Sequence, residues 1–355
     1  MFRTRQTHLL SPARRRDALY GGWDFVLEID QREGDPLPAF GSSYSEELVD
    51  WGDGLPPVHY ARSASSNAIG TVRSAPAMPS PGLHVVKVRL VHTATNANTR
   101  IVFGAANTSV STPAYMPQLR RILKADFSGA TRMDNFCLKC IRLAWAAPVS
   151  GTYRVRSLAS AFQYCTSLQS LELGDLPACT SLASAFQACT SLQSLELGDL
   201  PRVQNILAMC RTCTKLERIS IHAAGETIVT ACTPFSGCRS LRRIDGPMRL
   251  SPDGPVANNS SHGFYSMFSG RDLLESMPDI WPRGGFTSAA AVSTNFSAMF
   301  NGCLNMRGTA PEWIWAGDAA HAPLTGNVKD MFQRCWMLDN YDDIPTTYTS
   351  SWRYR

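Results

Sequence analysis

The stretch that decides the fold is SLASAFQYCTSLQSLELGDLP, residues 157–177, which recurs as SLASAFQACTSLQSLELGDLP at residues 181–201. The two copies differ only where Tyr164 corresponds to Ala188. A unit of this length cannot bury its apolar face alone, so it is stable only when copies stack on one another. The duplication therefore predicts a solenoid.

Weaker copies of the frame F-x-x-C-x-x-L continue the repeat in both directions. Its last leucine or methionine recurs at Leu143, Leu168, Leu192, Leu216, Leu241, Leu274, Met306 and Leu338. The spacing is 24 or 25 residues up to Leu241 and 32 or 33 residues beyond it. Leu119, in QLRRIL, matches Leu241, in SLRRID, and predicts a first strand without a preceding helix. The solenoid is thus expected to begin with compact units and to end with longer ones.

Each unit is predicted to hold one short helix followed by one short strand. Leu182, Ala185, Phe186 and Cys189 fall at helical spacing. The leucines of residues 192–197 then approach the period of two that is typical of a strand, and Gly198-Asp199 ends it. Stacked units of this kind predict a ladder of parallel strands.

The repeat also accounts for most of the eleven cysteines. Seven occupy one repeat position and are predicted to form a buried structural ladder: Cys140, Cys165, Cys189, Cys213, Cys238, Cys303 and Cys335. The pairs Cys137/Cys140 and Cys210/Cys213 have the C-x-x-C spacing of zinc sites. Because one member of each pair belongs to the ladder, we favour a structural role over a metal site.

The frame F-x-x-C-x-x-L-x-x-L-x-L resembles the BspA-type leucine-rich repeat, over about two-thirds of the chain. That family occurs in bacterial and protozoan surface proteins and in some bacteriophage tail proteins. The resemblance implies adhesion or protein interaction and no catalytic residues. Two departures are Arg271 in a cysteine position and Cys210 in a phenylalanine position.

The N-terminal region has short predicted strands between Gly/Pro turns, which favours a β-sandwich. The strands are expected at residues 25–30, 49–54, 81–90 and 99–103. The sequence W-G-D-G at residues 51–54, followed by P-G-L-H-V-V-K-V at residues 81–88, resembles the polycystic-kidney-disease-type, immunoglobulin-like domain. His84 stands where that family has an aromatic residue, and the resemblance implies a spacer or contact module. Asp53 is interpreted as a turn residue rather than a metal ligand.

These patterns together predict an α+β chain in which a β-sandwich precedes a leucine-rich-repeat solenoid. The expected divisions are a basic arm (1–20), the sandwich (21–107), a linker (108–114), the solenoid (115–345) and a tail (346–355).

Composition excludes several classes of function. The net charge of +5 with 18% charged residues is not typical of a nucleic-acid-binding protein, and no segment has the apolar length of a membrane helix. No H-E-x-x-H, G-x-S-x-G or Walker-type motif occurs, so we expect neither an enzyme nor a cofactor nor a metal. Glu172, Glu196 and Glu217 are expected on equivalent strand positions, as a solvated column of carboxylates.

Binding surfaces are the better candidates. An acidic partner could meet Arg239, Arg242, Arg243 and Arg249, and a protein or sugar could meet Trp281, Trp313 and Trp315. Insertions at residues 252–262, 282–293 and 316–327 are expected on one face, which in stacked repeats is often the binding face. Arg14, Arg15 and Arg16 are interpreted as an arm that anchors the chain in an assembly.

Three functions remain open. The first is a bacteriophage virion component, in the tail, baseplate or fibre, which contacts other virion proteins or a host surface protein or glycan. It is favoured by a spacer-plus-adhesin layout without an N-terminal signal peptide, because a virion protein folds in the host cytoplasm and is released by lysis. The alternatives are a bacterial cell-surface adhesin whose leader was removed and an intracellular protein-interaction module.

Overall fold

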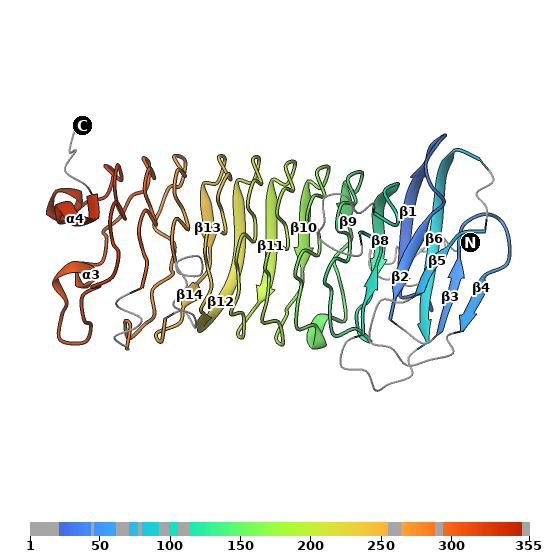
Figure 1. Cartoon of the computed structure of the whole chain (residues 1–355), viewed down its shortest axis with the longest axis horizontal. Helices are drawn as coiled ribbons and strands as arrows, with labels where there is room; N and C mark the ends of the chain where they lie inside the picture. Colours follow the sequence, from blue (N-terminus) through green and yellow to red (C-terminus); the bar gives the residue numbers. More distant parts are fainter. Residues whose placement is uncertain are drawn as a thin grey trace, which may run out of the picture.

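The protein is a straight stack of coils that begins at a small β-domain (Figure 1). The computed structural model describes residues 21–43, 46–61, 71–76, 80–91, 99–105, 114–254, 264–287 and 294–349. The coils follow one another along the long axis of the molecule, from the N-terminal strands to the last short helix (Figure 1). Secondary structure is mostly strands and turns, and the four described helices have three or four residues each.

Two sheets face each other at the N-terminal end. The strands are β1 (Phe25–Gln31), β2 (Ala39–Ser42), β3 (Glu46–Asp50), β4 (Val58–Ala61), β5 (Thr71–Ser74), β6 (Gly82–Val91) and β7 (Ile101–Val102). One sheet contains the order β4-β3-β6-β1 and the other the order β5-β2-β7. The Phe40 ring of the small sheet lies 5.7 Å from the Trp51 ring and 5.8 Å from the Phe103 ring. The strands predicted at residues 25–30, 81–90 and 99–103 are confirmed by β1, β6 and β7, whereas the strand predicted from Val49 begins and ends earlier, as β3.

The first coil continues the larger N-terminal sheet. Strand β8 (Leu119–Ala125) pairs antiparallel with β1 and parallel with β9 (Trp145–Ala146). The Arg142 guanidinium adds a second link, because it donates to both carboxylate oxygens of Asp35 at 2.6 and 2.9 Å. Buried apolar residues of both regions form one continuous cluster. The expected strand at Leu119 is present, and it joins the two regions.

Parallel strands form one side of the compact coils. They are β10 (Ser170–Leu173), β11 (Ser194–Asp199), β12 (Arg218–Ile228), β13 (Arg243–Asp245) and β14 (Met248–Leu250). Leu171 lies beside Leu195, and Leu195 lies beside Ile219, so the apolar side chains stack in the interior. The alternate residues of these strands face solvent, as the period of two requires.

The prediction of one short helix in each unit is wrong. Residues 157–166 and 181–190 form successive turns, in which Ser184 and Ala188 adopt positive φ angles of 54° and 62°. Equivalent residues of the neighbouring coil, Ser160 and Tyr164, have φ angles of 56° and 63°. Non-glycine residues seldom adopt this conformation, so the surrounding structure must stabilise it.

Hydrogen bonds between coils supply that stabilisation. The N–H groups of Leu182, Ser184, Phe186 and Ala188 donate to carbonyls of the next coil, at residues 205, 207, 209 and 211. An α-helix would use these N–H groups internally. The turns instead pair alternate residues with the neighbouring coil, so each compact coil has one backbone ladder on its strand side and another on its turn side.

The later coils keep the turn-side ladder and lose most of the strand pairing. Among described residues beyond Leu250, parallel pairing is reduced to one bridge, between Ser276 and Arg307. The rings of Phe268, Phe300 and Phe332 stack at 5.2 and 5.5 Å, with interplanar angles of 7° and 4°. The short elements of the chain's coils are η1 (Thr152–Arg154), α3 (Trp313–Ala316), η2 (Tyr341–Asp343) and α4 (Thr346–Thr349). No described helix has the length and apolar character needed to cross a membrane.

Candidate binding surface

The seven cysteines of the repeat lie in the interior, and all of them are fully buried. Six thiols donate a hydrogen bond to a carbonyl of the preceding coil, at 2.9–3.2 Å: Cys165, Cys189, Cys213, Cys238, Cys303 and Cys335. Burial raises the pKa of the Cys303 thiol to about 12 and that of Cys335 well above its usual range. These thiols therefore remain protonated donors, with the low reactivity of buried cysteine.

The two C-x-x-C pairs arise from an exchange of large and small residues. The Cys137 N–H donates to Ala161 just as the Phe162 N–H donates to Ala185, so Cys137 occupies the phenylalanine position. Phe136, next to it, occupies the position of Ala161 and restores the lost volume. Cys210 with Met209 repeats this exchange, as their hydrogen bonds show. The described residues contain no group of three potential metal-binding side chains at these cysteines or elsewhere.

Arg271 takes over the hydrogen bond of the cysteine that it replaces. Its guanidinium donates to the Phe235 carbonyl at 3.1 Å, across the same coil boundary that a cysteine thiol would bridge. The side chain is only 6% exposed, and burial lowers the pKa of the guanidinium. The departure from the repeat therefore preserves the contact between coils.

The four arginines proposed from the sequence do not form one open basic patch. Arg242 pairs with Glu275 at 3.7 Å, Arg243 with Asp245 at 3.0 Å, and Arg249 with Asp279 at 2.6 Å. Arg239 is exposed, but it follows Cys238 on the turn side, away from the strand that carries Arg243. Three of the four charges are thus already neutralised within the chain.

The proposed tryptophans pack against the core rather than projecting from it. Trp281, Trp313 and Trp315 are partly buried. The Trp281 and Trp313 rings meet edge to face at 5.7 Å. Of the three predicted insertions, residues 255–263 and 288–293 lie outside the described residues, and so does the arm with Arg14, Arg15 and Arg16.

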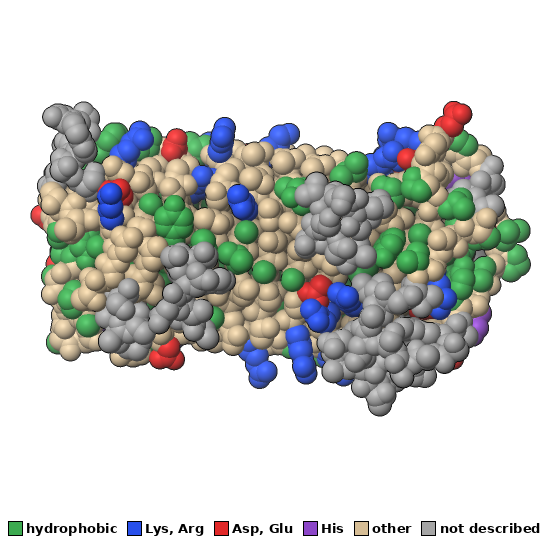
Figure 2. Space-filling model, in the orientation of Figure 1, with side chains coloured by type: hydrophobic (Ala, Val, Ile, Leu, Met, Phe, Trp, Pro, Cys, Tyr) green, Lys and Arg blue, Asp and Glu red, His purple; other side chains and the backbone are tan. Residues whose placement is uncertain are grey.

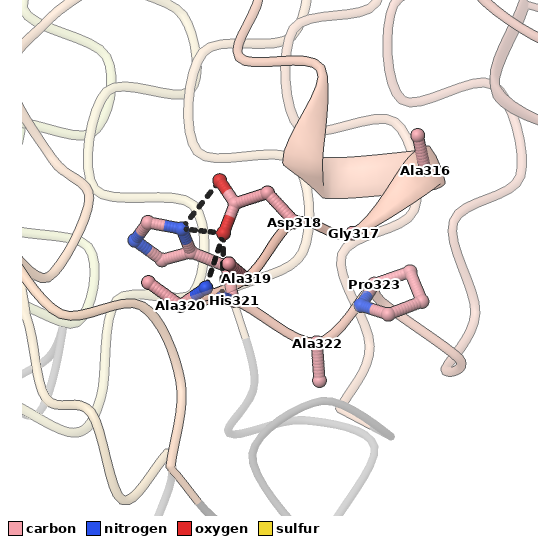
Figure 3. Close-up of a pocket in the computed structure, with 8 residues that line it drawn as sticks. All are labelled: Ala316, Gly317, Asp318, Ala319, Ala320, His321, Ala322 and Pro323. Carbon is pink, nitrogen blue, oxygen red and sulfur yellow. Dashed lines mark hydrogen bonds and ion pairs between the residues drawn. The ribbon is translucent and has the colours of Figure 1, made fainter.

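The described insertion folds into a loop over an open cavity of about 510 Å³, lined by residues 316–323 (Figure 3). Both Asp318 oxygens lie 2.7 Å from Nδ1 of His321, and the His321 ring stacks on Trp313 at 5.0 Å. The Ala320 N–H, at 2.7 Å, is the main cause of the lowered pKa of Asp318, and His321 lowers it further. All these contacts hold the loop itself, so they account for the Asp–His pair without a ligand.

A different groove, of about 370 Å³, lies on the outer face of the strands. It is lined by Trp145, Ala146, Pro148, Ser170, Leu171, Glu172, Ser194 and Glu196. The expected carboxylate column is only partly correct. Glu172 lies beside Glu196, but Glu196 pairs with Ser220. The Glu217 N–H instead donates to the carbonyl of Gln193, just before strand β11 begins.

Trp145 was missed in the sequence because the repeat frame assigns no role to its position. Its equivalents in the next two coils are Ser170 and Ser194. A large aromatic residue in an outward position that elsewhere holds serine or arginine is the signal that could have identified it.

Charge is sparse on the face that Figure 2 shows, where basic side chains are scattered and acidic ones are few. The groove at Trp145 combines an exposed aromatic ring with two exposed carboxylates. Comparison of the chain with protein-family models, curated proteins and solved structures finds no match.

Proposed function

We propose that this chain is a non-enzymatic binding or structural protein, and specifically a virion component of a phage tail, baseplate or fibre. In this proposal the coils are BspA-type leucine-rich repeats without the helix, and the N-terminal sheets form the polycystic-kidney-disease-type module. Its partners are other virion proteins or a host surface protein or glycan.

The observation that carries the proposal is the joint between the two regions. Strand β8 of the first coil is hydrogen-bonded to β1 of the N-terminal sheets, and one buried apolar cluster runs through both. Such a joint holds the two regions as one rod, which presents an extended contact surface at a fixed angle. A rigid rod of this kind suits a part of a larger assembly.

The thiols support the virion over an exported adhesin. All eleven cysteines are free, and ten of them are buried. Free thiols in this number are typical of proteins that fold under reducing conditions. A virion protein meets those conditions, because it folds in the host cytoplasm before release.

The test is the fate of the full chain during particle production. Particles from a lysate of the producing cells would be separated on a density gradient, and the chain quantified by mass spectrometry in each fraction. We expect it to co-sediment with the particles at a fixed ratio to a capsid protein. Recovery in the soluble fraction or in the bacterial envelope would contradict the proposal.

A further inference from the structure

Trp145 places an aromatic ring where the next two coils have serine and the preceding coil has arginine. It lies on β9, in register with Arg121 of β8, and it remains 38% exposed. The inward residues around it are apolar and buried, so Trp145 is not needed to fill the core. An exposed tryptophan at the wall of a groove is typical of a binding site for another molecule.

The two carboxylates of the groove are exposed and adjacent. Glu172 and Glu196 are direct neighbours on parallel strands, which lie about 4.8 Å apart. Among the described residues, neither glutamate forms an ion pair, although the chain carries a net charge of +5. Like charges directly opposite each other destabilise a sheet, so a cation bound between them would relieve the repulsion.

The cations that border the groove are already engaged. Arg121, on one side, is paired with Glu28 at 3.7 Å. Arg218, which follows Ser194 on the other side, is paired with Asp245 at 2.6 Å. The groove therefore keeps a local charge of about −2 that the neighbouring side chains do not compensate.

We propose that this groove binds an arginine side chain on an extended segment of a partner protein. A guanidinium can stack on the Trp145 indole and donate to Glu172 and Glu196, while Ser170 and Ser194 accept the remaining N–H groups. A lysine would supply the charge without the flat face that suits stacking. A neutral sugar could stack on the indole, but it would leave the two carboxylates uncompensated.

This inference rests on the proposed binding role and names the chemistry of one partner contact. The probe is a blocked peptide, acetyl-Gly-Arg-Gly-Arg-Gly-amide, titrated into the full chain by calorimetry at low ionic strength. The comparison peptide carries citrulline in place of arginine, which keeps the shape and removes the charge. We expect binding of the arginine peptide and at least a tenfold loss with citrulline.

Variants locate the binding. Trp145→Ser installs the serine that the next two coils carry at this position. Glu172→Gln with Glu196→Gln removes both charges of the groove. Each is expected to weaken peptide binding at least tenfold. The matched control, Glu33→Gln with Glu312→Gln, removes two exposed charges elsewhere and is expected to change affinity less than twofold. Unchanged thermal melting verifies that every variant is folded.

Several results would overturn the inference: equal binding of the citrulline peptide, full affinity in Trp145→Ser, or an equal loss in the control. Trp145-dependent binding of a neutral oligosaccharide without binding of the arginine peptide would assign the groove to a sugar instead. The peptide titration and the particle fractionation can fail separately. If the chain co-sediments with particles but does not bind the arginine peptide, this inference is refuted and the proposed function is not.

Discussion

The compact coils and the longer coils are held together differently. Between Ser157 and Leu250, each coil pairs with the next through both strands and turns. Among the residues that the structure describes beyond Leu250, the turn-side ladder continues, while the strand side is reduced to scattered hydrogen bonds and one bridge. The turn side, where a helix was expected, is therefore the part of the coil that all described units share.

The interior compensates for what the longer coils lose at the strands. In the compact coils, a large and a small residue alternate at the phenylalanine position and the position before it, as in Ala185-Phe186 and Met209-Cys210. In the longer coils both residues are large, as in Met299-Phe300. The buried methionine before each phenylalanine adds apolar volume to the longer coils, beside the stacked rings.

The largest expected effect comes from removing the central ring of that stack. Phe300→Ala should cost about 3–5 kcal/mol, the typical range for a buried phenylalanine, and Phe186→Ala a similar amount. Because the coils around Phe300 lack a strand ladder, the loss there should open residues 264–349 locally. Amide hydrogen exchange measures this. If Phe186→Ala exposes its own coils to exchange just as strongly, the second ladder of the compact coils has no stabilising role.

Arg271 marks the boundary between the two kinds of coil, and its loss should have the next largest effect. Arg271→Ala removes the guanidinium donor from the Phe235 carbonyl, which keeps only the Cys238 N–H, and creates a cavity, at an expected cost of about 2–3 kcal/mol. Urea denaturation followed by circular dichroism would report it. Arg271→Lys is the control, since it keeps a charge but shortens the reach. Wild-type stability in the alanine variant would show that the contact contributes nothing across the boundary.

The cysteine ladder allows equivalent substitutions to be compared in the compact and the longer coils by urea denaturation. Cys189→Ala and Cys335→Ala each remove one S–H···O hydrogen bond and a small buried volume, for about 1–2 kcal/mol. Because the two thiols make equivalent contacts, we expect their denaturation midpoints to fall by similar amounts. A much larger fall of the midpoint for Cys335→Ala would indicate that the stability of the longer coils depends more strongly on the cysteine ladder.

The smallest expected effect concerns Asp245, the last residue of β13. Arg218 and then Arg243 lower the pKa of its carboxyl below the usual value. Because the pKa is lower in the folded chain, the stabilisation is present above the unfolded pKa of about 3.9 and is lost as the pH falls through the folded pKa. Asp245→Asn should cost about 0.5–1 kcal/mol at pH 7, and stability curves of the two proteins should converge in acid. Parallel curves down to low pH would contradict this assignment.

The sequence predicts the period, the buried leucines and the first strand at Leu119, because these depend on a pattern of apolar residues that repeats. It does not predict the turns. Leu182, Ala185, Phe186 and Cys189 have helical spacing, and a chain of turns brings the same residues inward. The choice between the two is made by hydrogen bonds to a coil 24 residues away. Nothing in the local propensities of Ser184 and Ala188 indicates their positive φ angles.

The candidate surface was harder to predict than the fold. The arginines near residue 242 look available in the sequence, because their partners Glu275 and Asp279 lie in the following coil. Trp145 is not predicted by the repeat, because the repeat is defined by buried residues and Trp145 is exposed. The groove depends on one residue that departs from it.

The nearly identical coils at residues 157–177 and 181–201 make the length of this rod an adjustable quantity. Alternate N–H groups of residues 158–164 and 182–188 donate to equivalent carbonyls of the next coil, so a further copy could be inserted with the same hydrogen bonds to both of its neighbours. Each added copy would lengthen the rod by about 4.8 Å. Unequal recombination within the repeated gene segment could then change the length of the molecule in small, uniform steps.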